Sequence, residues 1–323
     1  MKRLRRLALT ALLAVCLMTG SALAAVDPNL PEYQPVSGIS GTIISAGSDT
    51  MINMVALWGE GFRKHYPNVR IEVEGKGSST APPALISGAA QVGAMSREMR
   101  PSEIDAFEAR YGYKPTMLQV ALDALAVYVH KDNPIQGLTL AQVDSMFSRN
   151  QQGGGPAINT WGEAGLTGDW TNRPVSLYGR NSASGTYGYF KEVALFGGDF
   201  RNTVKEQPGS AAVVQGVSVD RYGIGYSGIG YITSGVRAVP LARAEGEPYF
   251  DTSAENVLSG DYPLARFLQI YVNKAPNQPI DPLVREFVRY IFSREGQEAV
   301  EKDGYLSVPA DFAAKQVALV AGE

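Results

Sequence analysis

Cysteine is almost absent from this chain of 323 residues, and the one cysteine, Cys16, lies close to the N-terminus. If the leader described below is removed, the remaining chain contains no thiol. Without thiols there can be no disulfide, no cysteine zinc site and no thiol catalysis. The fold must then be held together by packing alone.

Histidine is also scarce, because only His65 and His130 are present. A serine hydrolase needs a nucleophile and a base, and neither histidine lies in a recognisable catalytic motif. Metal-dependent hydrolysis gathers several His, Asp and Glu ligands, and no clustered spacing of that kind is visible. We therefore expect no enzyme, no catalytic residue, no metal and no cofactor.

The N-terminus has the pattern of a secretory signal. Four basic residues precede an apolar stretch over residues 7–18, and a small-x-small sequence ends at Ala24. We expect a signal peptide over residues 1–24 and export after its cleavage. A retained membrane anchor is disfavoured because a spanning helix needs roughly 20 apolar residues. Lipidation at Cys16 is disfavoured because Val15 is larger than the residue that usually precedes a lipidated cysteine.

The sequence also lacks an excess of basic over acidic residues. Removal of the leader takes away four positive charges and no negative ones, so the formal net charge falls from −3 to −7. Nucleic-acid binding usually needs a basic face, so we expect no nucleic-acid partner. An anionic ligand would have to be captured by local donors rather than by overall charge.

The chain that remains has an ordinary globular composition, with 45% hydrophobic and 19% charged residues, and its length suits two domains. After an N-terminal arm over residues 25–40, apolar runs alternate with amphipathic ones. The patterns predict strands over residues 41–46, 69–74 and 91–95, and helices over residues 50–66, 82–87 and 102–111. This alternation implies an α/β fold whose largely parallel sheet is covered by helices.

The middle of the chain repeats the alternation. Helices are predicted over residues 140–148, 187–195 and 210–220, a strand over 175–179, and closing helices over 282–293 and 294–302. Two long strands, around residues 122–130 and 267–272, bracket this section, as expected when one α/β domain is inserted into another and the two close around a ligand. The predicted lobes are residues 41–130 with 264–323, and residues 131–263, with the return between 235 and 264.

One loop has the chemistry of an anion site. The segment from Arg180 to Thr186 joins a predicted strand to a predicted helix, where unpaired backbone N–H groups and the helix dipole favour negative charge. Ser184 and Thr186 add hydroxyl donors, Gly185 permits close backbone approach, and Arg180 offers a planar fork for an oxyanion. Helix capping alone could explain this single loop.

Three further loops share that chemistry. They follow predicted strands and comprise Gly47-Ser48-Asp49-Thr50, Gly75-Lys76-Gly77-Ser78-Ser79-Thr80 and Ser96-Arg97. In α/β sheets the ligand binds at the carboxyl ends of the strands, so these loops are expected to converge. Several converging loops favour an anion site over capping alone.

These loops resemble those of the periplasmic phosphate-binding proteins of bacterial phosphate ABC importers, and the resemblance runs from Gly47 to about Pro309. It implies a type II periplasmic binding protein fold, in which two lobes, each a mainly parallel sheet flanked by helices, are joined by two crossover strands. It also implies that a monomeric periplasmic receptor binds inorganic phosphate between its lobes with high affinity and delivers it to an inner-membrane ABC permease.

The resemblance assigns ligand positions residue by residue. The implied phosphate ligands are Ser48, Thr50, Ser78, Arg180, Ser184, Gly185 and Thr186, with Ser79 and the amide of Met51 as further additions. Some family members carry, after the Gly-Ala of the fourth loop, an aspartate that accepts the proton of hydrogen phosphate and so rejects sulfate. This chain has Gly93-Ala94-Met95-Ser96-Arg97 there, which places donors where that acceptor was expected.

The acceptor must therefore lie elsewhere or be absent. Asp49 is the first candidate, although it could equally cap the first helix, and Asp123 on the crossover strand is the second. Arg97 and Arg180 could neutralise a dianion, or could instead pair with Asp49 or Asp123. A receptor for another oxyanion such as sulfate, an exported phosphoester hydrolase and a structural or adhesive role are the competing functions.

A match to the pattern G-x-G-x-x-G over residues 223–228 also needs an interpretation. A dinucleotide site requires a well-formed helix directly after this motif. Residues 229–240 instead predict loop and strand, so a tightly turned strand near the cleft is favoured.

Overall fold

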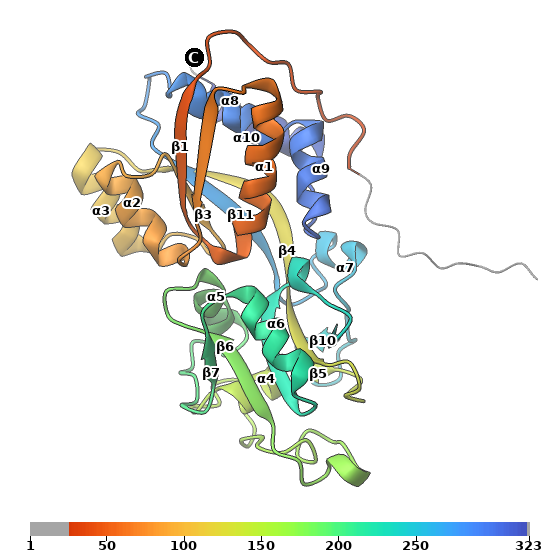
Figure 1. Cartoon of the computed structure of the whole chain (residues 1–323). Helices are drawn as coiled ribbons and strands as arrows, with labels where there is room; N and C mark the ends of the chain where they lie inside the picture. The colour runs from red at the N-terminus through yellow and green to blue at the C-terminus, as the bar shows by residue number, and fades with distance from the viewer. Residues whose placement is uncertain (1–25, 322–323) are drawn as a thin grey trace, which may run out of the picture.

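The computed structural model describes residues 26–321. The predicted signal peptide, its cleavage site and Cys16 lie outside the described residues. The chain forms two lobes, one above the other in Figure 1. The first lobe contains both ends of the described chain, drawn in orange and blue, and the second lobe is built from the middle of the chain, drawn in green and cyan.

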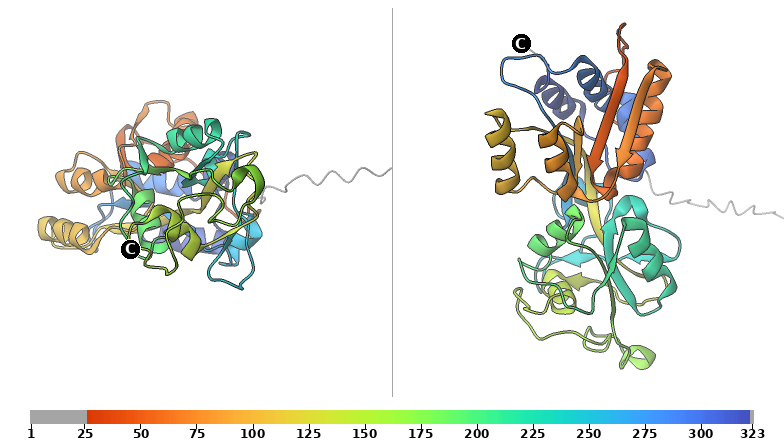
Figure 2. Two further views of the ribbon diagram at one scale, coloured as in Figure 1. Left: turned by 90° about the horizontal axis from the view of Figure 1, so that it is seen from below. Right: turned by 60° about the vertical axis from the view of Figure 1, so that its left-hand side comes forward.

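The first lobe is built on four strands and six helices. Its central strand β1 (Gly41–Gly47) pairs in parallel with β2 (Val69–Glu74) and β3 (Val92–Met95), and β11 (Ala265–Val272) runs antiparallel to β3. The helices are α1 (Ile52–His65), α2 (Ala81–Ser87), α3 (Pro101–Tyr111), α8 (Pro282–Ile291), α9 (Arg294–Lys302) and α10 (Ala310–Ala318). Helix α1 contacts α8 and α9 on one side, and α2 contacts α3 on the other (Figure 2).

The second lobe has its own small parallel sheet. Strand β6 (Ser176–Arg180) pairs in parallel with β7 (Lys205–Gln207) and β8 (Gly223–Gly228). Four helices flank this sheet: α4 (Leu140–Phe147), α5 (Gly185–Val193), α6 (Ser210–Val219) and α7 (Ala254–Leu258). Short β5 (Leu138–Thr139) pairs with β10 (Leu241–Ala242), and β9 (Val236–Ala238) pairs with β4 (Thr116–His130).

Strand β4 (Thr116–His130) joins the two lobes. Its first part, as far as Ala124, pairs antiparallel with β11, and its second part, from Leu125, pairs with β8 and β9. The ladder therefore runs without interruption through both lobes in the order β2-β1-β3-β11-β4-β8-β6-β7. Each lobe is a mixed α/β layer structure, as the alternation of the sequence predicted.

Each lobe buries its own apolar core. In the first lobe Trp58 and Phe62 of α1 are fully buried against Phe287 of α8, and their i, i+4 spacing places them on one face of the helix. In the second lobe Phe190 of α5 stacks on Tyr226 of β8 with ring centroids 3.9 Å apart. The core of each lobe therefore fixes the strands whose ends meet between the lobes.

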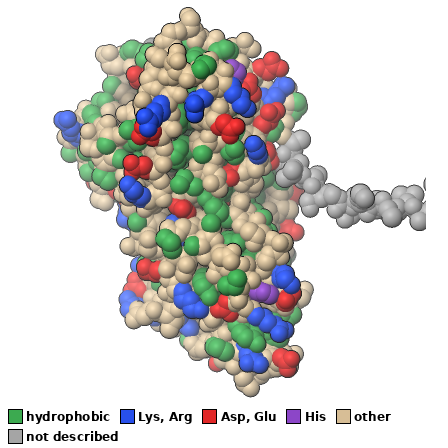
Figure 3. Space-filling model, in the orientation of Figure 1, with side chains coloured by type: hydrophobic (Ala, Val, Ile, Leu, Met, Phe, Trp, Pro, Cys, Tyr) green, Lys and Arg blue, Asp and Glu red, His purple; other side chains and the backbone are tan. Residues whose placement is uncertain are grey.

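The surface carries charges of both signs. Basic and acidic side chains are interspersed over both lobes on the face drawn in Figure 3. Among residues 26–321, no helix has the length and apolar character that membrane crossing demands.

Candidate ligand-binding site between the lobes

A cluster of buried polar residues lies where the two lobes meet. Its members are less than 4% exposed and comprise Ser48, Thr50, Ser78, Ser96, Arg180, Ser184 and Thr186. They follow the carboxyl ends of β1, β2, β3 and β6. The structure thus brings together the four loops that the sequence predicted to converge.

The hydroxyl groups of the first lobe bond to one another. Ser48 Oγ donates to Ser96 Oγ over 3.0 Å, and the amide of Ser96 donates to Ser78 Oγ over 3.1 Å. Burying a hydroxyl is costly unless it is hydrogen-bonded, so this arrangement keeps the donors in fixed positions. The result is a preorganised set of donors for an anion.

The N-terminus of helix α5, in the second lobe, packs against these hydroxyls. Thr186 Oγ1 lies 2.9 Å from Thr50 Oγ1 across the lobe boundary. A Cβ on Gly185 would overlap Ser78 Oγ and lie 2.6 Å from Ser96 Oγ, so only glycine fits this close approach. Helix α5 begins at Gly185, two residues before its predicted start, because Ser184 is the N-cap and its Oγ accepts the amide of Tyr187 at 3.3 Å.

Arg180 stands at the end of β6 and is only 2% exposed. Its Nη1 donates to Ser210 Oγ over 2.8 Å and pairs with Asp49 Oδ2 at 3.1 Å. Burial lowers the pKa of this guanidinium, and the Asp49 carboxylate offsets part of that effect. Its Nε is buried and has no hydrogen-bond partner among the described residues. Arg180 therefore keeps a donor available for a bound anion.

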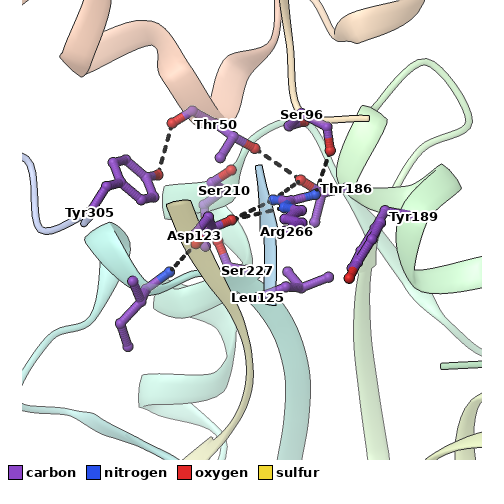
Figure 4. Close-up of polar contacts among 12 residues, drawn as sticks. Thr50, Ser96, Asp123, Leu125, Thr186, Tyr189, Ser210, Ser227, Arg266 and Tyr305 are labelled. Atoms are coloured by element: carbon purple, nitrogen blue, oxygen red, sulfur yellow. Dashed lines mark hydrogen bonds and ion pairs between the residues drawn. The ribbon is translucent and has the colours of Figure 1, made fainter. Parts of the chain in front are cut away.

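A second arginine, Arg266 on β11, completes the cluster and was missed from the sequence. Its Nε and Nη2 donate to Asp123 Oδ2 over 2.9 and 2.7 Å. Its Nη1 donates to the carbonyl of Ser96, and Nη2 also reaches Thr186 Oγ1 at 3.1 Å. Figure 4 shows this guanidinium between Asp123 and Thr186, so Arg266 links both lobes.

A signal for this pair is present in the sequence. Arg266 and Asp123 are isolated charges within two largely apolar strands, and the register of β4 and β11 places them directly opposite each other. Opposite charges in two buried strands indicate a buried ion pair, because an unpaired charge is rarely tolerated there. The hydroxyls of Tyr231 and Tyr305 also reach the site, where they donate to the carbonyls of Asp49 and Thr50, each over 2.9 Å. These tyrosines and Ser210 were missed as well, since nothing local in the sequence marks them.

Arg97 was expected to neutralise the ligand or to pair with Asp49 or Asp123, and that pairing is not found. Its Nη2 binds Glu103 Oε1 at 2.7 Å, and it also donates to the Ser79 hydroxyl over 3.2 Å. Glu103 lies in the first turn of α3, close enough to capture the guanidinium. Arg97 and Ser79 therefore lie beside the hydroxyl cluster rather than in it.

Two other sequence motifs have defined positions. The side chain of Met51 is fully buried in the first core, and its amide donates to the carbonyl of Ser48 at 3.3 Å. The glycine-rich motif over residues 223–228 forms β8 and leads into a single 3-10 turn, Ile229–Tyr231. It therefore lacks the helix that a dinucleotide site needs. Within residues 26–321, no group of three or more His, Cys, Asp or Glu side chains could hold a metal.

The formal charges of the cluster cancel. Arg180 pairs with Asp49, and Arg266 pairs with Asp123. The site therefore offers oriented hydroxyl, amide and guanidinium donors instead of a net positive charge. Such donors, at the N-terminus of α5, suit a compact oxyanion.

Two lobes, shared central strands and a buried donor cluster between them define a two-lobe solute-binding protein. The family model of the PBP superfamily domain matches residues 34–295. The chain is 54% identical to the phosphate-binding protein PstS of Pseudomonas aeruginosa over 318 residues, and this alignment covers 98% of each chain. It is also 25% identical over 305 residues to PstS of Bacillus subtilis, covering 94% of this chain and 92% of that protein.

A solved structure agrees with these relatives. A phosphate ABC transporter substrate-binding protein of Clostridium perfringens, determined with bound phosphate, superimposes with a TM-score of 0.70 at 25% identity and covers 83% of this chain and 100% of that one. The chain therefore belongs to the PstS family of phosphate-binding proteins within the PBP superfamily. The predicted family and the type II periplasmic binding protein fold are both confirmed.

Proposed function

We propose that this protein binds inorganic phosphate in the cleft between its two lobes and delivers it to an inner-membrane ABC permease. The observation that carries the proposal is the buried cluster of hydroxyl and guanidinium donors between the lobes of a chain 54% identical to a phosphate-binding protein. The named relatives are binding proteins, so capture without chemical change is the favoured role.

The proposed phosphate ligands follow from the cluster. They are Ser48, Thr50, the amide of Met51, Ser78, Ser96, Arg180, Ser184, Gly185 and Thr186, supported by Ser79 and Arg97 at the edge. Arg180 Nε supports this assignment, because it is a buried donor without a partner among the described residues and a fitting oxyanion would relieve that penalty. The lobe division stays a proposal, residues 41–130 with 264–323 and residues 131–263, and its first boundary moves to about residue 124 because β4 pairs with the second lobe from Leu125 onward.

Selection against sulfate requires an acceptor for the phosphate proton, and we propose Asp49 for this role. Both oxygens of Asp123 are already occupied, one by Arg266 and the other by the amide of Ile229 at 3.0 Å. Asp49 Oδ1 has no hydrogen-bond partner within residues 26–321. Sulfate has no proton to donate to this carboxylate. The carboxylate therefore repels sulfate and lowers the affinity of the site for it.

The remaining assignments extend the family role to this chain. A periplasmic location fits the proposed signal peptide over residues 1–24, and a monomer suffices because both lobes come from one chain. The permease is the proposed partner, and neither a cofactor nor a nucleic acid is required.

Isothermal titration of the mature chain, freed of phosphate by partial unfolding and refolding, tests the proposal. We expect tight binding of phosphate and much weaker binding of sulfate. Arg180→Ala should weaken phosphate binding by at least about 100-fold, because a buried charge-assisted bond is worth about 1.5–3 kcal/mol and further bonds are disturbed. Arg97→Ala, the matched control, should weaken it by less than about tenfold because Glu103 already holds Arg97.

Other outcomes would contradict the proposal in distinct ways. Equal affinity for phosphate and sulfate would indicate a general oxyanion receptor. Turnover of a phosphoester such as p-nitrophenyl phosphate would indicate a hydrolase. An equal loss in the two arginine variants would place the site nearer to α3.

A further inference from the structure

Helix α6 of the second lobe has an N-terminus that its own segment does not cap. Its N-cap residue is Gly209, which has no side chain, and no side-chain cap is made from within the helix. The first amide, that of Ser210, instead donates to Asp49 Oδ2 over 2.8 Å. Asp49 precedes α1 in the first lobe, so the helix is capped by a residue of the other lobe.

Three segments of the second lobe converge on Asp49. The oxygen that caps α6 also pairs with Arg180 Nη1 at the end of β6, at 3.1 Å. The backbone carbonyl of Asp49 accepts the hydroxyl of Tyr231 over 2.9 Å. A Cβ on Gly209 would lie 2.9 Å from Asp49 Oδ1, so the bare glycine makes room for the carboxylate.

These contacts exist only while the lobes are together. If the lobes separate, α6 loses its N-terminal acceptor, buried Arg180 loses its anionic partner, and Tyr231 loses its carbonyl acceptor. Each loss leaves a polar group to be satisfied again by water. The closed arrangement is therefore favoured by a set of bonds that the ligand itself does not make.

We infer that Asp49 is an interlobe latch, a positioning residue that holds the lobes closed over bound ligand and fixes the orientation of Arg180. The inference rests on the proposed function and deepens it. The latch uses Oδ2, whereas the proton-acceptor role proposed above uses Oδ1, so the two roles make different predictions. A latch controls how slowly the ligand leaves, and a proton acceptor controls which oxyanion is chosen.

The chemistry of the side chain at position 49 separates these roles. An asparagine oxygen can still accept the amide of Ser210, since Asn is as good an N-cap as Asp. It lacks the charge that pairs with Arg180 and cannot repel sulfate. Alanine removes every side-chain contact. Replacement of an N-cap by alanine costs a factor of roughly 2 to 30 in an equilibrium constant.

The test measures phosphate association and dissociation rates by stopped flow for the wild type, Asp49→Asn, Asp49→Ala, Gly209→Ala and the double variant Asp49→Ala/Gly209→Ala. We expect Asp49→Ala to speed dissociation by about 5- to 30-fold with little change in association rate. Asp49→Asn should fall between Asp49→Ala and the wild type in dissociation rate, and it should lose phosphate-to-sulfate discrimination. Gly209→Ala should speed dissociation in the wild-type background, because its methyl group displaces the carboxylate, but not in the Asp49→Ala background.

The double-variant cycle distinguishes a latch from a general structural effect. If Gly209→Ala speeds dissociation by the same factor in both backgrounds, the two residues are not coupled and the latch is refuted. If phosphate leaves the Asp49→Ala and Asp49→Asn variants at the wild-type rate, the latch is refuted while the proposed function stands. If the wild type itself does not bind phosphate, the proposed function fails, and this inference fails with it.

Discussion

Replacement of Arg266 by methionine gives the sharpest test of how the two lobes are held. Methionine has a similar length and keeps the apolar contacts of the side-chain stem. It removes both bonds to Asp123 and the donors to the Ser96 carbonyl and Thr186 hydroxyl. Among residues 26–321, Asp123 would then be a fully buried carboxylate held only by the amide of Ile229.

The structure sets the expected magnitude. The side chains of Arg266 and Asp123 are 3% and 0% exposed, so this is a buried ion pair. Breaking such a pair by removing one partner costs about 3–5 kcal/mol, because an uncompensated charge stays buried. Replacing both partners by apolar residues removes that charge. Arg266→Met/Asp123→Leu should therefore lose less stability than Arg266→Met alone, in spite of carrying two substitutions.

The assay is urea unfolding in phosphate-free buffer, because bound phosphate would add to the apparent stability. We expect Arg266→Met to lower the free energy of unfolding by about 3–5 kcal/mol and the double variant to recover at least about 1 kcal/mol of that loss. A loss below about 1 kcal/mol in the single variant, or additive losses in the double, would refute a buried pair of this strength.

Two further predictions concern the lobe boundary. Gly185→Ala should weaken phosphate binding by about 5- to 150-fold, because its Cβ would overlap Ser78 Oγ. Gly188→Ala is the control: its Cβ would lie 3.2 Å from Arg97 Cδ, a contact that a small shift relieves, so affinity should change less than threefold. Equal titration results for the two variants would contradict this packing. Burial raises the pKa of Asp303 to about 7, from an ordinary value of 3.8. The folded state then binds more protons than the unfolded state between these values, so the free energy of unfolding falls as pH rises from about 4 to about 7. Asp303→Asn should remove that slope. The free energy of unfolding of the variant minus that of the wild type should therefore rise by roughly 1–2 kcal/mol between pH 4 and pH 8. If urea unfolding gives the same difference at both pH values, the shift is contradicted.

Local patterns predicted the first part of the first lobe well, whereas α10 at its C-terminal end was not predicted. The boundaries from β1 to α3 agree with the structure to within two residues, because each element has a clear apolar period and is bounded by glycine, proline or polar residues. The strands β5, β7 and β10 were not predicted. They have two or three residues each, too few to show a period, and their pairing is decided by partners distant in the sequence.

The site was predicted only in part, because local patterns can be recognised in the sequence and pairings between distant residues cannot. Ser48, Ser78 and Ser184 lie in loops whose residue types by themselves indicate an anion site, and the geometry of the sheet brings these loops together. Pairing of Arg97 with Asp49 or Asp123, one of the alternatives left open by the sequence, is not found because Glu103, six residues away on α3, binds its guanidinium. The role of Arg266 depends on the register between β4 and β11, which joins residues 143 positions apart.

Strand β4 couples the stability of the two lobes. Leu118, Val120 and Ala121 lie in the first core, whereas Val127 and Val129 lie in the second. If either half of the strand leaves its sheet, the neighbouring half loses its anchor, and the apolar surface of the other lobe is exposed. The two lobes should therefore melt together as one folding unit, and neither should be stable when expressed alone.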